Sequence, residues 1–478
     1  MQVAHPAIPN NFSGLAGMTR SVLSEMDRRG PRYTSYPTAD RFSPDFAVAD
    51  YLRAVSERRG MGSRRALSLY LHIPFCDTVC YYCACNKIVT RNRAKAALYL
   101  SYLKREIAMQ GSLFAGMNQV EQLHFGGGTP TYLSDQQMGD LMAHIRKCFT
   151  LAPDHAGEYS IEVDPRTVSV ERVQALRAQG FNRISLGVQD FDPEVQGAVN
   201  RVQSEEQTLD IIGAARAAGF RSVSIDLIYG LPKQHAMSMA RTLAKVVAAS
   251  PDRIAVYNYA HLPQLFKTQR LIDENDLPGA DARLDMLSLC IRQLSSAGYV
   301  HIGMDHFAKP ADDLAVAQRQ GRLHRNFQGY STHAETDLVA CGVSAIGAVG
   351  SSYSQNEKAL DGYYARLDNS TLPIARGIRL GMDDVLRRLI IQRLMCNFEL
   401  SLNSLEIAYP IVFREYFAAE MEKLKALEQQ GLVRIEPEWI AVEPKGRLLI
   451  RNICMVFDRY LEEDRNKAGA PQRYSQTV

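Results

Sequence analysis

The chain has 478 residues, of which 46% are hydrophobic and 22% are charged, a composition typical of folded globular proteins and not of disordered or collagen-like chains. The formal net charge is only +3, which argues against nucleic acid or an anionic membrane surface as a partner. No apolar run reaches roughly 18 residues, so we expect no membrane-spanning helix. The first residues lack a basic start followed by an apolar stretch, so we expect a cytoplasmic protein without a signal peptide.

Residues 1–30 show little periodicity and contain several Pro, Asn, Gly and Ser residues, so we expect a flexible arm. From residue 66 onward, short runs of β-branched and aromatic residues alternate with longer amphipathic stretches. The short runs predict strands at 67–73, 120–125, 159–163, 183–188, 222–228 and 253–257. The amphipathic stretches predict helices at 94–109, 134–148, 169–178, 205–218 and 236–249.

Six strands joined by helices predict an α/β fold built from βα units around a parallel sheet. The periodicity alone does not distinguish a closed barrel, a partial barrel and an open sheet. In each of these folds, ligands bind at the carboxyl ends of the strands. The candidate chemical groups lie there. A cysteine group follows the first strand, a glycine run at 126–128 follows the second, Glu162 ends the third, Gln189 follows the fourth, and Asp226 lies late in the fifth.

Beyond residue 361 the pattern changes to helices with one hairpin. The predicted elements are helices at 383–396, 411–429 and 446–460 and hairpin strands at 433–436 and 440–443. We therefore expect three domains, namely an N-terminal arm over 1–40, a βα barrel domain over 41–360, and a mostly helical C-terminal domain over 361–478.

Four of the nine cysteines crowd into ten positions, as Cys76, Cys80, Cys83 and Cys85. In a reducing compartment such a group favours metal ligation or catalysis over disulfides. Structural zinc commonly needs four ligands in two separated pairs, which this spacing does not provide. A [4Fe–4S] cluster held by the first three thiolates leaves one iron open to a small molecule, whereas Cys85 as a fourth ligand would close the site. We expect the other five cysteines to pack in the core.

The spacing Cys76-x3-Cys80-x2-Cys83, with Tyr82 before the third cysteine, resembles that of the radical S-adenosylmethionine enzymes. The resemblance implies a partial, TIM-barrel-like βα barrel and a [4Fe–4S] cluster held by the three cysteines. It also implies that the open iron binds the amino and carboxylate groups of S-adenosylmethionine, whose reductive cleavage yields a 5′-deoxyadenosyl radical. The glycine run at 126–128 corresponds to a segment that contacts the methionine amino group in that family.

Longer segments, spread from about residue 31 to 458, resemble the oxygen-independent coproporphyrinogen III oxidases of that superfamily. They include PRYTSYPT at 31–38, YLHIPFCDTVCYYCACNKIVT at 70–90, HFGGGTPTY at 124–132, GMDHFA at 303–308 and HRNFQGY at 324–330. The resemblance implies anaerobic decarboxylation of two propionates of coproporphyrinogen III to vinyl groups, giving protoporphyrinogen IX in haem biosynthesis. It also implies a monomer, a reductant such as flavodoxin, and an electron acceptor that the sequence does not identify.

The same resemblance implies two bound S-adenosylmethionine molecules and assigns residues to roles. The cofactor-binding positions are Tyr70, Tyr82, Gly127, Gly128, Thr129, Glu162, Gln189, Arg201, Asp226, Ala260 and Ile346. Tyr70 and Cys85 are expected to act in catalysis, with Cys85 needed for activity without binding the cluster. The expected substrate contacts are Arg32, Tyr33, Phe327 and Gln328. Ala84 departs from the family, which commonly has Gly there, and would matter only if the backbone needed a positive φ.

Three other functions compete with this interpretation. A haem chaperone related to these enzymes would lack Cys85 and the PRYTSYPT segment, both of which are present. An anaerobic haem-degrading methyltransferase shares the cluster, but HRNFQGY and GMDHFA argue against it. A passive iron–sulfur electron carrier would not need so long a chain with glycine and acidic residues at the strand ends.

Overall fold

The computed structural model describes residues 28–60, 65–465, 474 and 476, so most of the predicted arm lies outside the described residues. The barrel unit comprises residues 39–278 and 335–381, and the helical unit comprises the described residues of 1–38, 279–334 and 382–478. The predicted domain limits at 40 and 360 stay a prediction. The two units of the structure divide the chain at other residues, because residues 279–334 share a hydrophobic core with the C-terminal segment.

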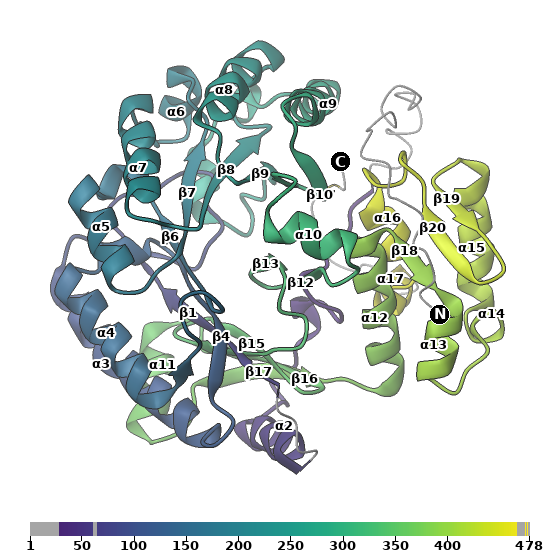
Figure 1. Ribbon diagram of the computed structural model, residues 1–478, viewed down its shortest axis with the longest axis horizontal. Coiled ribbons are helices and arrows are strands. Elements are labelled where there is room, and N and C mark those ends of the chain that lie inside the picture. Colours follow the sequence, from purple (N-terminus) through teal and green to yellow (C-terminus); the bar gives the residue numbers. More distant parts are fainter. Residues whose placement is uncertain (1–27, 61–64, 466–473, 475, 477–478) are drawn as a thin grey trace. The chain divides into compact units, whose positions relative to one another are not determined.

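Six parallel strands form most of the wall of the barrel unit (Figure 1). Their order is β9 (Arg253–Asn258), β8 (Ser222–Tyr229), β7 (Arg183–Gln189), β6 (Glu158–Val163), β4 (Gln119–Gly127) and β1 (Leu67–Ile73). All six predicted strands are confirmed, and every neighbouring pair is parallel. Within the described residues of this unit no pairing joins the two ends of the sheet, which is therefore a partial barrel and confirms the expected fold class.

Four further strands extend the sheet beyond β1, and the sequence patterns missed them. They are β14 (Asp337–Cys341), parallel to β1, followed by the antiparallel strands β15 (Ile346–Val349), β16 (Ser352–Asn356) and β17 (Ile374–Arg379). Every residue of β14 and β16 is buried, so neither strand shows the alternation that marks a strand with one wet face.

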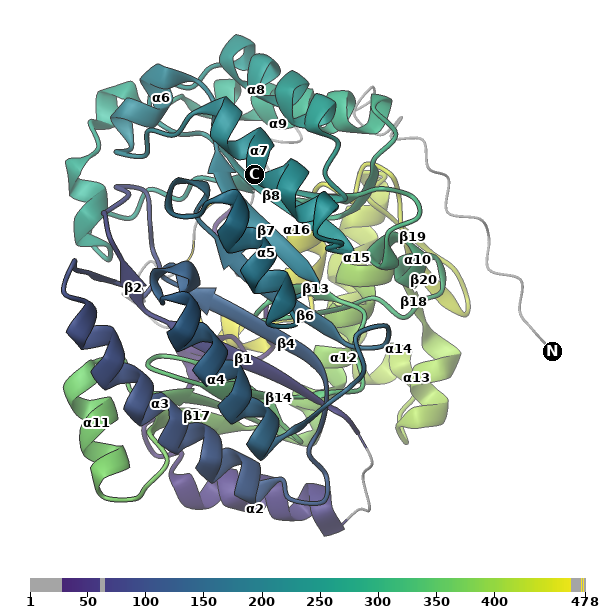
Figure 2. The same cartoon turned by 60° about the vertical axis from the view of Figure 1, so that its left-hand side comes forward.

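The predicted helices cover one face of this sheet, as Figure 2 shows. They are α3 (Arg93–Leu113), α4 (Asp135–Cys148), α5 (Val170–Ala178), α7 (Glu205–Ala217) and α8 (Ala236–Ala249). Local signals set their ends. Ser134 and Gln137 form a capping box at the start of α4, and Gly219, with a φ of 81°, follows α7 in the left-handed conformation that favours glycine.

The opposite face of the central strands is polar and half-buried. In β6 the odd-numbered residues are buried, whereas Ser160 and Glu162 alternate with them and are partly accessible. The parallel register places Glu162 opposite Ser185 on β7, and Gly187 of β7 opposite Asp226 on β8. Alternation thus gathers these polar side chains on the interior face of the barrel, near the carboxyl ends of the strands.

In the helical unit, α12 (Met382–Asn397) is central to the hydrophobic core. The hairpin expected near 433–443 is confirmed as β19 (Val433–Ile435) and β20 (Trp439–Val442), and β18 (Glu399–Ser401) adds a third strand. The expected helix at 411–429 is divided into α14 (Phe413–Tyr416) and α15 (Ala418–Gln429), because Phe417 is not helical. The expected helix at 446–460 is shorter, with α16 over Ile450–Met455.

The same unit contains α9 (Ala280–Ser296) and α10 (Asp313–Arg319), together with two short hairpins. The hairpin strands are β10 (Val300–Gly303) with β11 (His306–Ala308), and β12 (His324–Asn326) with β13 (Gly329–Ser331). Of the helices in the described part of the chain, none has the length and apolar character needed to cross a membrane.

One buried carboxylate fastens the outer strands to α3. Glu106, fully buried on α3, accepts hydrogen bonds from the backbone N–H of Gly342 at 2.7 Å, Asn356 Nδ2 at 2.7 Å and the Tyr363 hydroxyl at 2.6 Å. Burial raises the pKa of Glu106 to about 7, although these hydrogen bonds act in the opposite direction. The three donors come from the ends of β14 and β16 and from α11 (Leu360–Asp368), so one side chain joins four elements.

The raised pKa of Glu106 predicts a pH-dependent stability. The folded chain binds this proton more tightly than the unfolded chain does, so the contribution is complete below about pH 4.5 and is lost as the pH rises towards 7. The difference amounts to about 3 kcal/mol. Glu106→Gln should remove this slope from urea-unfolding free energies measured between pH 5 and 8, whereas Glu206→Gln, on the exposed face of α7, should keep it. Identical pH profiles for Glu106→Gln and the wild type would contradict the prediction.

Candidate active site

The four clustered cysteines lie in one loop that follows β1, and this loop is fixed at its base and its middle. A short parallel pair, β2 (Phe75–Cys76) and β3 (Ile88–Val89), closes the base. In the middle, the Tyr81 N–H donates to the carbonyl of Val199 at 3.0 Å, and Asn200 Nδ2 donates to the carbonyl of Val79 at 2.7 Å. The segment after α6 (Pro193–Ala198) therefore shapes the cysteine loop.

Hydrogen-bond donors surround the first two sulfurs. Thr129 Oγ1 lies 3.4 Å from Cys76 Sγ. Arg201 Nη1 lies 3.4 Å from Cys80 Sγ, and Arg166 Nη2 lies 3.6 Å from the same atom. Donors and positive charge at a sulfur favour its thiolate form, which is the form that binds iron.

The third and fourth cysteines interact with each other. A hydrogen bond with Cys85 lowers the pKa of the Cys83 thiol to about 6, and the same contact raises the pKa of Cys85. Burial raises the pKa of Cys76 to about 11. The backbone at Ala84 is not in the left-handed region, so the replacement of the usual glycine carries no strain. None of the nine cysteines forms a disulfide.

These residues fit a [4Fe–4S] cluster in their donor chemistry. Cys76, Cys80 and Cys83 could supply three sulfur ligands from one loop, and the arginines beside Cys80 would offset negative charge. Among the described residues, no three His, Cys, Asp or Glu side chains converge on a point where a single metal ion would sit. A cluster does not need that convergence, because each thiolate binds a different iron.

Asp164, directly after β6, organises the charges beside Cys80, and sequence reasoning missed it. Its carboxylate accepts from Arg201 Nη1 at 3.1 Å and from Arg166 Nη2 at 2.7 Å. Burial raises the pKa of Asp164, but the bonds from Arg166 and the charge of Arg201 outweigh burial and lower it. The spacing Asp164-x-Arg166 at a strand end was the available signal, and it is a weak one in a single sequence.

A chain of polar and aromatic groups crosses the interior face from β1 to β6. His72 Nε2 lies 2.9 Å from the carbonyl of Asn86, which only accepts, so Nδ1 accepts from the Tyr70 hydroxyl at 3.1 Å. The Tyr70 ring stacks on His124 with centroids 5.8 Å apart, and His124 Nε2 lies 3.1 Å from Glu162 Oε1. Burial raises the pKa of Glu162, but the hydrogen bond and charge of His124, together with the Gly127 N–H, outweigh burial, so the pKa is lowered and this acid stays ionised.

The predicted glycine run packs against this wall and against the cysteine loop. A Cβ on Gly127, whose φ is 116°, would lie 2.7 Å from the His72 ring, and one on Gly128 would lie 2.7 Å from the backbone of Pro74. The Gly127 N–H donates to Glu162 Oε2 at 3.2 Å. Any side chain at these positions would therefore displace His72 or the loop, which explains the glycines physically.

Two more predicted residues complete the interior face. Asp226 accepts from the Ser185 hydroxyl at 3.2 Å, and burial, helped by the charge of Glu162, raises its pKa to about 7. Gln189 follows a register shift in β7 and has a φ of 67°, which is uncommon for a residue other than glycine. A low-pKa carboxylate and a high-pKa carboxylate thus lie on the same interior face.

The remaining predicted cofactor-binding residues of the barrel unit, Tyr82, Ala260 and Ile346, have fewer contacts with the residues described above. Buried Gln269, which sequence reasoning also missed, donates to the carbonyls of Tyr82 at 3.0 Å and Ala260 at 3.2 Å and so links the cysteine loop to the segment after β9. Ile346 begins β15, and within the described chain no hydrogen bond, ion pair or ring contact joins it to the other predicted residues.

The four expected substrate residues belong to the helical unit. Arg32 Nη1 pairs with Asp305 Oδ2 at 2.7 Å, and the buried Tyr33 hydroxyl donates to Asp458 Oδ2 at 2.9 Å. Phe327 and Gln328 form the turn between β12 and β13.

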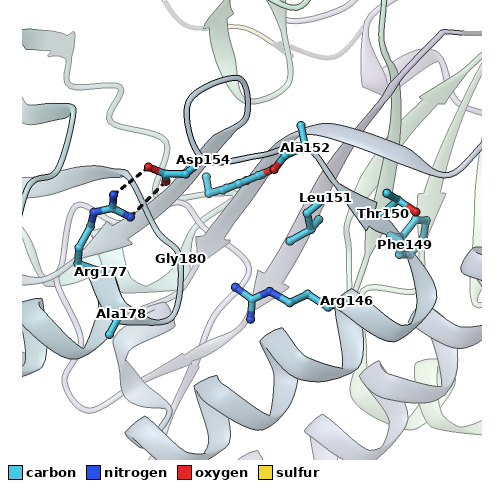
Figure 3. A pocket seen from close by; sticks show the side chains of 10 residues that line it. Arg146, Phe149, Thr150, Leu151, Ala152, Asp154, Arg177, Ala178 and Gly180 are labelled. Carbon is cyan, nitrogen blue, oxygen red and sulfur yellow. Dashed lines mark hydrogen bonds and ion pairs between the residues drawn. The ribbon is translucent and has the colours of Figure 1, made fainter.

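A cavity of about 620 Å³ lies elsewhere in the barrel unit (Figure 3). Its lining includes Tyr159, near the start of β6, and Arg177, which pairs with Asp154 at 2.9 Å. The cavity contains none of the predicted site residues and lies at the amino ends of the strands, opposite to the end where βα barrels carry their active sites.

Comparison with known proteins places this site in a family. The model of the radical SAM superfamily matches residues 70–246, and that of the HemN C-terminal domain matches residues 382–449. The chain is 50% identical over 440 residues to the oxygen-independent coproporphyrinogen III oxidase of Pseudomonas aeruginosa, and the matched region covers 92% of this chain and 95% of that relative. It is 52% identical over 443 residues to the corresponding protein of Salmonella typhimurium, covering 93% and 95%.

The solved structure of coproporphyrinogen III oxidase from Escherichia coli, described as a radical SAM enzyme, has a TM-score of 0.87 to this chain at 51% identity and covers 90% of this chain and 97% of that one. The resemblance predicted from the cysteine spacing and the longer segments is thereby confirmed. The superfamily implies a [4Fe–4S] cluster and S-adenosylmethionine. The chain belongs to the family of oxygen-independent coproporphyrinogen III oxidases, within the radical S-adenosylmethionine superfamily.

Proposed function

We propose that this chain catalyses the oxygen-independent oxidative decarboxylation of two propionate side chains of coproporphyrinogen III to vinyl groups, giving protoporphyrinogen IX in haem biosynthesis. The observation that carries the proposal is identity of 50% or more to such enzymes over more than nine-tenths of the chain, including both matched family regions. We further propose that the enzyme binds two S-adenosylmethionine molecules, takes electrons from a reductant such as flavodoxin and passes electrons to an acceptor that is not identified. We also propose that it works as a monomer in the cytoplasm.

Cys76, Cys80 and Cys83 would hold the cluster, which leaves one iron for S-adenosylmethionine. When bound, the cluster and S-adenosylmethionine would supply radical chemistry, namely a one-electron cleavage of S-adenosylmethionine to a radical able to remove hydrogen from a propionate carbon. The chain's own contribution is to bind and orient. Arg201, held by Asp164 and by the carbonyl of Gly187, would pair with a methionine carboxylate, and the ionised Glu162 would accept from an ammonium or a ribose hydroxyl.

Tyr70 and His72 offer a neutral hydrogen-bonded pair on the same face, because burial lowers the pKa of His72 and raises that of Tyr70. Neither group carries charge near neutral pH, so the negative charge of this face comes from Glu162 and in part from Asp226, whose pKa is about 7. A carboxylate-lined interior suits a cofactor that carries a sulfonium and an ammonium group. Tyr82, Gly127, Gly128, Thr129, Gln189, Ala260 and Ile346 are proposed as further cofactor contacts.

The function is tested by anaerobic reconstitution of the protein with iron and sulfide, followed by dithionite, S-adenosylmethionine and coproporphyrinogen III. The expected products are 5′-deoxyadenosine and protoporphyrinogen IX, measured by chromatography. Cleavage of S-adenosylmethionine without a change in the porphyrinogen would favour the chaperone or the methyltransferase. Absence of both products from a protein with full iron content would refute the proposal.

A cysteine series separates cluster ligation from activity. Cys83→Ser should lose most of the cluster, whereas Cys85→Ser should keep its iron and its ultraviolet–visible absorption but lose at least about tenfold in porphyrinogen turnover. The matched control is Cys148→Ser, at the end of α4, which should retain both properties. If Cys85→Ser loses the cluster, Cys85 is instead the fourth ligand and the site is closed.

Asp164 is expected to act as a positioning residue for Arg201. Asp164→Asn removes the charge that orients the buried guanidinium of Arg201 and the half-buried one of Arg166. The Kd and KM for S-adenosylmethionine should therefore rise about tenfold, while iron content and kcat change less. Asp154→Asn, which removes an exposed ion pair with Arg177, is the control and should leave both constants unchanged. Unaltered cofactor affinity in Asp164→Asn would show that Arg201 does not depend on this contact.

A further inference from the structure

The hairpin β12–β13 in the helical unit has its backbone fixed by α12. The Arg325 N–H donates to Gln392 Oε1 at 3.1 Å, and Gln392 Nε2 donates to the Arg325 carbonyl at 2.5 Å. Across the hairpin Arg325 is opposite Tyr330, so their side chains share one face, and the Arg325 guanidinium carbon lies 4.7 Å from the centre of the Tyr330 ring. The backbone contacts do not involve the guanidinium group.

The guanidinium of Arg325 is buried, and some of its N–H donors have no acceptor among the described residues. Only 3% of the residue is exposed, yet among the described residues neither Nε nor Nη1 has a hydrogen-bond partner. A buried N–H of a charged group without a partner costs at least about 1–3 kcal/mol. Native structures seldom retain such a cost without a role for the group.

A second buried group without partners lies three residues away. Both side-chain amide atoms of Gln328 are inaccessible to solvent, and neither has a hydrogen-bond partner within the described part of the chain. The Gln328 backbone N–H is satisfied by Asn326 Oδ1 at 2.8 Å, so the turn itself is well formed. The hairpin therefore carries two polar side chains that its own fold leaves unsatisfied.

Arg325 is one of several positively charged side chains that act on the carboxylate of Asp305. Burial raises the pKa of Asp305, but the charges of Arg32, His306, Arg325 and Arg451 outweigh it and keep this carboxylate ionised. Arg32 pairs with Asp305 at 2.7 Å, while Arg451 donates to the backbone carbonyls of Pro31 and Gln476, each at 3.0 Å. The positive charges of Arg32, Arg325 and Arg451 thus all act on the carboxylate of Asp305, and they would act in the same direction on the carboxylate of a ligand.

We propose that Arg325 binds a propionate carboxylate of the substrate, with Gln328 as a second polar contact on the same hairpin. This inference rests on the proposed function, because the coproporphyrinogen III ring supplies the carboxylates. A carboxylate accepts hydrogen bonds from a guanidinium and from an amide Nε2, and the pyrrole N–H groups of the same ring are donors for an amide oxygen. The substrate class therefore offers both kinds of partner that the hairpin lacks.

The test measures binding of coproporphyrin III, the stable fluorescent oxidised form, and of its neutral tetra-amide to the reconstituted protein under anaerobic conditions. In Arg325→Gln the affinity for the tetra-acid should fall about 10- to 100-fold, whereas the affinity for the tetra-amide should change less than about twofold. Arg322→Gln removes an exposed guanidinium that pairs only locally with Gln320 and should alter neither affinity. The Kd for S-adenosylmethionine should also stay unchanged.

Several outcomes would overturn the proposal while leaving the function intact. The first is that Arg325→Gln binds the tetra-acid as tightly as the wild type does. The others are that its affinity falls equally for both porphyrins, or that it falls only for S-adenosylmethionine. If Arg325→Gln does not fold, Arg325→Lys serves as the second variant, because it keeps the charge but not the planar group. Its affinity for the tetra-acid should still fall several-fold, while its affinity for the tetra-amide should not change. Failure of the wild type to convert coproporphyrinogen III is a separate result that counts against the proposed function.

Discussion

The buried ion pairs of Asp164 with Arg201 and Arg166 are the interaction on which the rest of the active site depends. They place two guanidiniums beside the sulfur of Cys80, and the segment that delivers Arg201 also holds the cysteine loop through Val199 and Asn200. Strand end, loop and helix are therefore coupled through one carboxylate. A buried arginine without this partner would carry an uncompensated charge, so the arrangement is costly to disturb.

The barrel interior and the helical unit use opposite charge for different chemical tasks. On the interior face, Glu162 and Asp226 are acidic groups next to neutral Tyr70 and His72, an environment that suits a cationic cofactor. In the helical unit, several arginines act together on the carboxylate of Asp305, an environment that suits an anionic ligand. A formal net charge of +3 over the whole chain does not reveal such local groups, which explains why composition indicated neither ligand.

The parts of the fold that were predictable were those with a local signal. The six parallel strands and their helices follow periods of 2 and 3.6 residues, and their caps and glycines set the boundaries. β16 was not predictable, because Ser, Tyr, Ser, Gln and Asn form a strand only when it is paired and buried on both sides. The lengths of the helices at α14 and α16 were also overestimated, because the apolar pattern continues past the residues at which these helices end.

The sequence by itself determined the family and the placing of the cysteines and acidic residues at the strand ends, because these depend on spacing along the chain and on parallel topology. Only the tertiary structure decided which groups face one another. Asp164 meets Arg201 across 37 positions, His124 meets Glu162 across 38, and Arg325 lies against Tyr330 with N–H groups that no described residue accepts from. Contacts of this kind arise from register and burial between distant segments, and no local pattern in a single sequence records them.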